Sequence, residues 1–412
     1  MLRQWLLSAL PAMLILPPPA NIPDVLPVTN NIQQVYADED DGSVVINGFK
    51  CYLNETEGTF SIAQIMSLSS EDLVVPYTVT YEGKEYHCDE INLTYLRGNI
   101  RDQEDIIPDV KSVTFSEGIK TLKGYFPLNR CKKVTIPSTV ESIEYAAFNY
   151  GVSAGYSNMD EEWALWQDKY NANFTCFDLE EFVVDKDNKH FTAKDGLLYT
   201  KDMKMLMSCP RNKNGVVEIP EGVETLANGS FCLCNRVTEI KLPSTLKNIG
   251  YGYGRYPGFY YCLNLEKINI PEGVETVYGG SFRYCVKLKS LTLPTTLINI
   301  DVNYHESADR IEQLNIFGPL PSLTELNWED SGIESIDVPN DYTKLFAAPV
   351  PTQNLRLPKH VKTICSNAFY GVNPPAVLHL PATIESLGEK GSSDKVRGIP
   401  TQIYQRYMID FP

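Results

Sequence analysis

A short mark, in which an apolar residue precedes proline and a second apolar residue follows three positions later, recurs along most of this chain. It occurs at Ile136–Val140, Ile219–Val223, Leu242–Leu246, Ile270–Val274, Leu293–Leu297, Leu357–Val361 and Leu380–Ile384. The intervals Pro220 to Pro243, Pro271 to Pro294 and Pro358 to Pro381 are each 23 residues long. A repeat of between 20 and 29 residues is typical of a leucine-rich solenoid, in which each repeat adds one strand.

Each proline follows a short alternation of apolar and polar residues, as in Val237-x-x-Ile240-x-Leu242. Alternation with a period of two predicts a strand with one buried face, and proline ends the strand because it has no N–H for the ladder. A second apolar pair, such as Val223 and Leu226, is expected to face the same core from the opposite side. We expect successive strands to end at Phe115, Ile136, Ile219, Leu242, Ile270, Leu293, Ile316, Val338, Leu357 and Leu380.

Several repeats close with the pattern Phe-x-x-Cys, as at Phe231–Cys234, Phe259–Cys262 and Phe282–Cys285. Together with the strand and the proline mark, this pattern resembles the repeat of the BspA-like leucine-rich-repeat proteins over roughly residues 70–390. The segment Phe182–Tyr199 also resembles a hairpin insert common in that family. The resemblance implies a β-rich leucine-rich-repeat solenoid, a parallel strand ladder with short turns or helical segments on the other wall. It further implies secreted or cell-surface proteins that attach to host or microbial partners.

The chain is expected to divide into five parts. Residues 1–20 contain an apolar run too short to span a bilayer and are interpreted as a signal peptide, cleaved after Ala20 or as late as Ala37. A non-exported chain with an apolar start is the alternative. Residues 21–42 are expected to be a solvated spacer, and residues 43–108 a small N-terminal β cap with a hairpin turn at Tyr81–Lys84. The solenoid is expected to span residues 109–390, with an insert at residues 145–215. Residues 391–412 are expected to be a closing segment.

Charge and cysteine content narrow the range of functions. The formal net charge of −16 argues against nucleic acid or an anionic membrane as the main partner. Ten cysteines in an exported chain would suggest disulfides. However, Cys131, Cys234, Cys262 and Cys285 occupy the same place in their repeats, so we expect small buried thiols there. Cys51 and Cys88 are the pair to test first for a disulfide.

The sequence carries no convincing catalytic or metal site. Asp185-Lys-Asp187-Asn188 resembles the start of a calcium loop, but Lys189 at the fifth position and the lack of glycine at the sixth favour a simple turn. Cys232 and Cys234 have no second pair at zinc spacing. There is no Gly-x-Ser-x-Gly elbow and no glycine-rich phosphate loop. We therefore expect neither enzyme activity nor a cofactor.

Two groups of residues are candidates for ligand binding. In each strand, the residue between the last two apolar positions is expected to point outward, which gives the column Thr114, Thr135, Glu218, Lys241, Asn269, Thr292, Asn315, Asp337, Arg356 and His379. These could equally be ordinary solvated strand positions. The longer interval between Pro243 and Pro271 also contains a loop with residue types enriched at binding hot spots, namely Tyr251, Tyr253, Arg255 and Tyr256. Such a loop could instead fold back on the solenoid.

These observations predict a non-enzymatic binding or adhesion protein that recognises a host or microbial macromolecule, in the first place a protein, through its repeat surface. A glycan-binding accessory protein that captures polysaccharide is the alternative, and exposed coplanar aromatic residues would favour it. A passive surface spacer would have no saturable ligand. No nucleic-acid partner and no transmembrane segment are expected, while the ligand and the oligomeric state are left open.

Overall fold

The computed structural model describes residues 35–37, 42–67, 70–96, 110–124, 126, 130–144, 147–148, 178–251, 258–278, 281–282, 284–301, 320, 322–333, 335–336, 354–364 and 377–387. Over these residues the chain consists of short β-strands and tight turns, together with one 3-10 helix, η1 (Leu93–Tyr95). The strand-rich leucine-rich-repeat solenoid predicted from the sequence is confirmed, with strands and turns on both walls.

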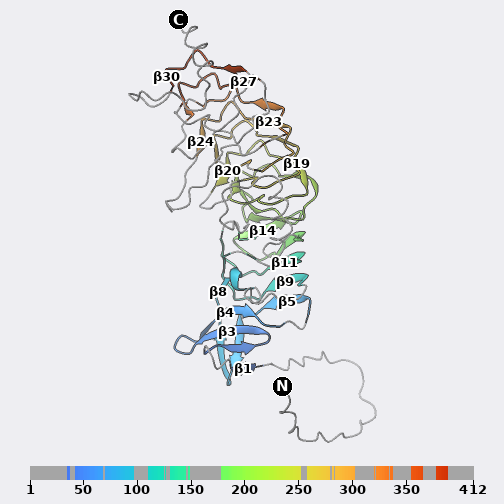
Figure 1. Cartoon of the computed structure of the whole chain (residues 1–412). Helices are drawn as coiled ribbons and strands as arrows, with labels where there is room; N and C mark the ends of the chain where they lie inside the picture. Colours follow the sequence, from blue (N-terminus) through green and yellow to red (C-terminus); the bar gives the residue numbers. More distant parts are fainter. Residues whose placement is uncertain are drawn as a thin grey trace, which may run out of the picture. The chain divides into compact units, whose positions relative to one another are not determined.

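The first wall consists of parallel strands from the segments that precede the turn of each repeat. One sheet contains β5 (Asp72–Val75), β9 (Ser112–Phe115), β11 (Lys133–Ile136) and β13 (Glu181–Val184). A second contains β17 (Gly215–Glu218), β19 (Val237–Lys241), β21 (Lys267–Asn269), β23 (Ser290–Thr292) and β25 (Glu325–Asn327). A third contains β27 (Asn354–Arg356) and β29 (Val377–His379). Figure 1 shows β5, β9 and β11 lying one above the other.

The second wall consists of the strands that follow each turn. One sheet contains β8 (Glu90–Asn92), β10 (Thr121–Lys123) and β12 (Ser142–Ile143). The next contains β14 (Phe191–Lys194), β15 (Leu197–Thr200), β16 (Met205–Ser208), β18 (Thr225–Ala227), β20 (Asn248–Tyr251), β22 (Thr276–Tyr278) and β24 (Asn299–Asp301). The last contains β26 (Ser335–Ile336), β28 (Thr363–Ile364) and β30 (Ser386–Leu387). From β16 to β24 every pairing in the second sheet is parallel.

Apolar side chains from both walls fill the interior in two large buried clusters, one from Val44 to Ala227 and one from Leu197 to Ile384. Val223 and Leu226, which the sequence placed on the opposite side from the first-wall strands, are both fully buried. The phenylalanines of the Phe-x-x-Cys pattern lie inside as well, and the ring of Phe259 lies 5.6 Å from that of Phe231 and 5.5 Å from that of Phe282. A single buried cluster extends from Leu197 to Ile384. Each rung therefore completes the core of its neighbours.

Proline begins a tight turn between the two walls. The backbone N–H of Val223 donates to the carbonyl of Pro220, and the same bond recurs after Pro243, Pro271, Pro294, Pro358 and Pro381. In the Glu-Gly versions of this turn, Gly222 and Gly273 each have φ of +98°. A type II turn requires a positive φ at its third residue, which glycine adopts without strain.

Side chains clamp each Glu-Gly turn to the Ser-Thr or Thr-Thr turn of the next rung. Glu221 accepts hydrogen bonds from the backbone N–H (3.0 Å) and the hydroxyl (2.9 Å) of Ser244. Thr245 accepts from the N–H of Gly222 (3.0 Å) and donates to the carbonyl of Val223 (2.8 Å). The same four bonds join Glu117 and Gly118 to Ser138 and Thr139, and Glu272 and Gly273 to Thr295 and Thr296. The clamp thus links rungs in pairs.

An N-terminal sheet precedes most of the solenoid. It contains β1 (Val35–Ala37), β2 (Val44–Ile46), β3 (Phe49–Asn54), β4 (Thr59–Ile65), β7 (Lys84–His87) and β6 (Thr78–Tyr81), in that order. The expected hairpin turn at Tyr81–Lys84 is confirmed by the antiparallel pairing of β6 with β7. Glu82 and Gly83 have φ of 49° and 79°, as a type I′ hairpin turn requires.

Two expectations about the order of the rungs need correction. The parallel ladder begins at β5, inside the segment 43–108 that the sequence assigned to the cap, because β5 pairs in parallel with β9. The first-wall strand next to β23 is β25, which the sequence analysis did not predict, because Thr292 pairs with Asn327. Ile316 and Val338 lie outside the described residues, and β26, just before Val338, pairs with β28 in the second wall. The apolar spacing near 316 and 338 matches the repeat in the sequence, whereas the strand that pairs with β23 is β25.

The predicted hairpin near residue 190 is present and is fixed by a buried asparagine. β14 pairs antiparallel with β15 around the turn at Asp195 and Gly196. The Asn188 side chain is fully buried, and its amide donates to the carbonyls of Pro137 (2.8 Å) and Val140 (3.0 Å). Its carbonyl oxygen accepts from the N–H groups of His190 (2.8 Å) and Phe191 (2.7 Å). Asp185–Asn188 is therefore a turn, as predicted.

Replacement of Asn188 by Ala is expected to destabilise the protein by about 2–4 kcal/mol, because it leaves two carbonyls and two N–H groups without their buried partner. Chemical denaturation followed by circular dichroism would measure the change. Asn269→Ala, at an exposed position of β21, is the matched control and is expected to stay within about 0.5 kcal/mol of the parent. Equal effects of the two substitutions would contradict a structural role for Asn188.

Candidate functional site

A row of polar side chains runs across the second sheet of the first wall. We define the outward row as Glu218, Lys241, Asn269, Thr292 and Asn327. Strand register brings neighbours in this row together, because Glu218 pairs with Lys241, Asn269 with Thr292, and Thr292 with Asn327. The apolar residues that flank the row, such as Ile240 and Ile270, are buried. The outward direction predicted for Lys241, Asn269 and Thr292 agrees with their exposed or half-exposed state.

Neighbouring members of the outward row also contact each other through their side chains. The ammonium group of Lys241 lies 3.6 Å from the carboxylate of Glu218, and the amide of Asn327 donates to the hydroxyl of Thr292 at 3.3 Å. Asn327, which the sequence analysis did not include, follows Thr292 in the row. Asn327 was missed because the apolar spacing around Ile316 matched the repeat more closely than that around Leu326.

The last described pair of first-wall strands continues the same pattern. Arg356 on β27 pairs with His379 on β29. Arg356 is exposed, and its guanidinium lies 3.6 Å from the carboxylate of Glu329, while His379 is half-buried. The backbone carbonyl of Arg356 accepts a hydrogen bond from the indole of Trp328 at 2.6 Å. Trp328 is buried, so it supports the backbone that presents Arg356.

Several predicted site residues cannot be compared with the structure. Asn315, Asp337, Tyr253, Arg255 and Tyr256 lie outside the described residues. Tyr251 ends β20, and its backbone pairs with Ala227. Tyr251 thus lies on the second wall, whereas the outward row lies on the first wall.

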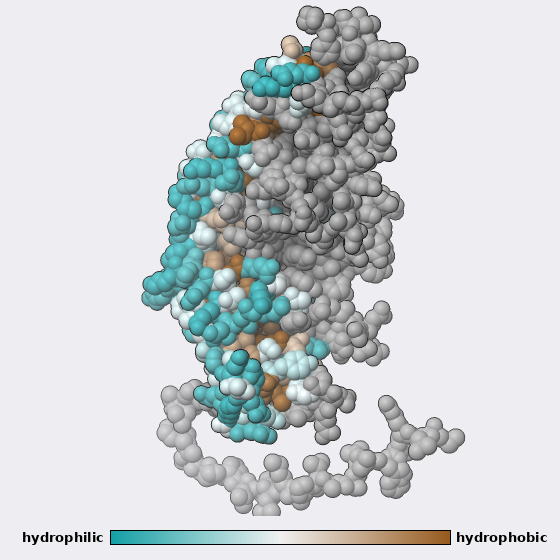
Figure 2. All heavy atoms as spheres, turned by 90° about the vertical axis from the view of Figure 1, so that its left-hand side faces the viewer, coloured by the Kyte–Doolittle hydropathy of each residue, from teal (hydrophilic) through white to brown (hydrophobic). Residues whose placement is uncertain are grey.

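Ion pairs between neighbouring rungs border both walls. Beside the outward row, the Lys289 ammonium lies 2.7 Å from Glu266 and lowers the pKa of that carboxyl group. On the second-wall side, Glu224 lies between Lys204 (2.5 Å) and Lys247 (2.9 Å). Hydrogen bonds from these two lysines lower the pKa of Glu224 to about 2. Figure 2 shows a face on which the described residues are mainly hydrophilic, with small apolar spots between them.

The cysteine side chains that the structure describes are buried and are poor nucleophiles. Cys131, Cys234, Cys262 and Cys285 are free and buried, as predicted. Burial raises the pKa of Cys131 and of Cys285 to about 12, and reactivity depends on the thiolate. Cys51 and Cys88 are free thiols in the structure, where they donate to the carbonyls of Phe49 and Glu90.

The described part of the chain offers no arrangement typical of metal chemistry. Within it, no group of three or more His, Cys, Asp or Glu side chains is placed to hold a metal ion. No helix among the described residues is long and apolar enough to cross a membrane. The outward row combines ammonium, amide, hydroxyl and carboxylate groups on a hydrogen-bonded backbone, which suits recognition of a polar surface.

Comparison with known proteins identifies the repeat. The model of the BspA type leucine rich repeat region matches six copies, at residues 107–194, 204–324, 254–347 and 342–392, and so spans more than half of the chain. The chain belongs to the BspA-type leucine-rich-repeat family. The matched residues include the first-wall strands from β9 to β29 and confirm the resemblance seen in the Phe-x-x-Cys and proline marks. No curated protein sequence matches the chain.

Three of the solved structures that resemble the chain do so at low sequence identity. The pneumococcal vaccine antigen PcpA is 16% identical, with 84% of this chain and 98% of that chain covered and a TM-score of 0.39. A leucine-rich-repeat protein from Bacteroides ovatus is 14% identical, with 89% and 97% covered and a TM-score of 0.37. A leucine rich cell surface protein from Faecalibacterium prausnitzii A2-165 is 16% identical, with 71% and 94% covered and a TM-score of 0.27. The family assignment rests on the repeat match.

Acid is expected to weaken the contacts between rungs of this BspA-type solenoid. The folded-state pKa of Glu221 and Glu272 is lowered by hydrogen bonds from Ser244 and Thr295, and that of Glu224 by its two lysines. A carboxyl group with a lowered folded-state pKa contributes stability above its unfolded pKa and loses it as pH falls through the folded value. The melting temperature should therefore fall between about pH 5 and pH 2.

A triple variant, Glu221→Gln, Glu224→Gln and Glu272→Gln, isolates these three groups. It should lose less melting temperature over the same pH range than the parent, and the difference should shrink in high salt because the groups are exposed. Scanning calorimetry at several pH values would measure both effects. Identical pH profiles for parent and variant would show that these carboxylates do not couple the rungs.

Proposed function

We propose that this chain is an exported, non-enzymatic surface protein that binds another macromolecule, a protein of a host or neighbouring cell, through the outer face of its first wall. The outward row carries the proposal, because its polar side chains stand in strand register and are held by contacts with each other. A surface ordered before binding loses little side-chain entropy on binding. Membership of a family of bacterial repeat proteins supports a binding role without defining the partner.

The size of the face sets how far the partner must extend. The second sheet of the first wall has five strands, and its longest, β19, has five residues. At about 3.3 Å per residue and about 4.8 Å between strands, the face covers roughly 400 Å². A stable protein interface buries about 800 Å² on each partner. A protein bound here is therefore expected to reach beyond these five rungs, onto the turns or onto further first-wall strands.

The chemistry of the row suggests a mixed polar partner surface. A second outward column beside it contains Glu239, Lys267, Ser290 and Glu325, which are also in register. Both columns contain acidic, basic and neutral groups, so neither presents a stripe of one charge. A uniformly charged polymer would meet repulsion at some rungs, whereas a folded protein surface can complement each group in turn.

We keep the tyrosine loop as a proposed additional contact. Tyr251, Tyr253 and Tyr256, with Arg255, are residue types that often dominate binding energy. The N-terminal apolar run is likewise proposed to be a signal peptide that brings the protein to the cell exterior. Asp337, Arg356 and His379 are proposed to extend the binding face toward the C-terminal repeats.

Binding of the purified full chain to immobilised matrix proteins and bacterial surface proteins would test the proposal, by biolayer interferometry. We expect saturable binding to at least one protein. The triple variant Lys241→Ala, Asn269→Ala and Asn327→Ala should weaken it by about tenfold or more, because polar contacts at the centre of an interface are lost together.

The matched control changes outward residues of the second wall instead, in the variant Thr225→Ala, Asn248→Ala and Thr276→Ala. These positions follow one another in register, and their replacement should leave affinity within about twofold of the parent. Equal losses in the two triple variants, or the absence of saturable protein binding, would refute the first-wall proposal. Tyr253→Ala with Tyr256→Ala tests the loop separately, since unchanged binding would remove it from the site.

A further inference from the structure

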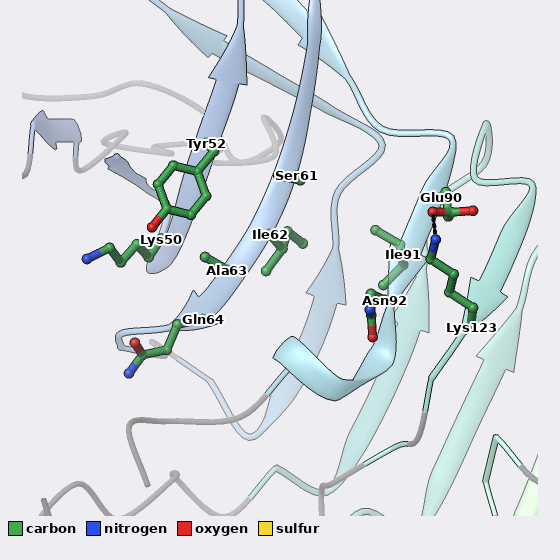
Figure 3. A pocket seen from close by; sticks show the side chains of 10 residues that line it. All are labelled: Lys50, Tyr52, Ser61, Ile62, Ala63, Gln64, Glu90, Ile91, Asn92 and Lys123. Carbon is green, nitrogen blue, oxygen red and sulfur yellow. Dashed lines mark ion pairs between the residues drawn. The ribbon is translucent and has the colours of Figure 1, made fainter. Parts of the chain in front are cut away.

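A groove lies away from the outward row, between the N-terminal sheet and the second wall. Its cavity volume is about 620 Å³, within the range typical of small-molecule sites. β3 and β4 form one side with Lys50, Tyr52, Ser61 and Gln64, and β8 and β10 form the other with Glu90, Asn92 and Lys123. Figure 3 shows Ile62 and Ile91 between these two sides.

The floor of the groove is apolar and its rims are polar. Ile62 and Ile91 are buried, with 6% and 1% of their surface exposed. On the β3 and β4 side, Tyr52 pairs with Ser61 and Lys50 with Gln64 across the strands. The Ser61 residue therefore lies directly across from Tyr52, while Gln64 lies across from Lys50, further along the same two strands. The groove thus combines an aromatic surface with hydrogen-bonding groups at its edge.

The exposure of Tyr52 is unusual for this chain. Its side chain is 43% exposed, and it is the aromatic residue among the large exposed hydrophobic side chains of the described residues. Tyr86, in the same sheet, is buried, and Tyr77 and Tyr81 are half-buried. An aromatic ring held on a paired strand and open to solvent provides a flat apolar surface for a ligand at little entropic cost.

The charge of the groove differs from that of the chain as a whole. Glu90 and Lys123 form an ion pair across β8 and β10, and Lys50 adds a positive charge on the other side. The groove therefore lacks the acidic excess behind the net charge of −16. A neutral or weakly acidic ligand can enter it without the repulsion that the rest of the surface would exert on a polyanion.

We propose that this groove binds the pyranose rings of a glycan, with Tyr52 as the stacking surface. One face of a pyranose ring presents C–H groups, which pack on an aromatic ring, while its hydroxyl groups both donate and accept hydrogen bonds. Ser61 lies across from Tyr52, Lys50 and Gln64 lie further along the same two strands, and Asn92 and Glu90 lie on the other side of the groove. This site goes beyond the proposed protein-binding face, because it uses different strands and none of the residues of the outward row.

A peptide is the less favoured occupant of the groove. An extended peptide gains most of its affinity by adding a strand to an open sheet edge. Here Ile62 and Ile91 occupy the space between β4 and β8, so an added strand would have to displace buried side chains. A sugar ring needs only the surface above this floor.

An oligosaccharide array tests the proposal with the purified full chain. The array should contain neutral cello-, malto-, xylo-, manno- and chitin-oligosaccharides together with heparin, hyaluronan and sialylated glycans. We expect binding to at least one oligosaccharide, confirmed by isothermal titration calorimetry. Tyr52→Ala should weaken it by about tenfold or more, whereas Tyr52→Phe should stay within about threefold because it keeps the ring.

Matched controls separate this site from the protein-binding face and from misfolding. Val216→Ala, at a hydrophobic residue on β17 that is 54% exposed, should leave glycan binding unchanged. So should the first-wall triple variant at Lys241, Asn269 and Asn327. Circular dichroism would confirm that each variant is folded. Absence of glycan binding, binding that survives Tyr52→Ala, or binding of extended peptides alone would overturn the proposal, whatever the result for protein partners.

Discussion

The structure depends on the burial of one apolar stripe that no single rung can cover. The second-wall side chains Leu226 and Ile249 and the first-wall side chain Ile240 lose nearly all their exposed surface only because the strands above and below complete the core. Burying each such side chain contributes about 1.5–3 kcal/mol relative to exposure, and an isolated rung would forfeit most of it. Stacking is therefore the condition for folding, and polar groups facing outward in register are its consequence.

Within this stack, the turns introduce a second level of organisation. In each of the three clamps described, the Glu-Gly turn comes first in the chain, and the turn of the next rung carries Ser-Thr or Thr-Thr. Glycine permits the positive φ of the first turn, while the threonine hydroxyl of the second links the N–H of that glycine to the next backbone carbonyl. The chain thus repeats in pairs of rungs as well as in single ones. Thr383 makes one of the two threonine hydrogen bonds of this clamp, since its hydroxyl group donates to the carbonyl of Val361.

Much of the fold could be predicted because period-two alternation and proline positions report directly on strands and turns. Buried residues such as Phe259 and Cys262 followed from their fixed place in the repeat. The rung at β25 could not be predicted, because the segment near Ile316 has the same apolar spacing as the repeat. Only the strand pairing identifies β25 as the neighbour of β23. Asn188 was read as a turn residue, but its partners Pro137 and Val140 lie about fifty positions earlier. The groove was also missed, because Tyr52 and Asn92 are brought together only by the fold.

Distance measurement between two members of the outward row tests the stacked, in-register arrangement most directly. Spin-labelled amino acids incorporated at Glu218 and Asn327 would stand four strand spacings apart, on β17 and β25. Pulsed electron paramagnetic resonance on the full chain should then give one narrow distribution centred at about 19 Å between the backbones. A broad distribution, or one centred well beyond that value, would mean that these strands do not share one sheet.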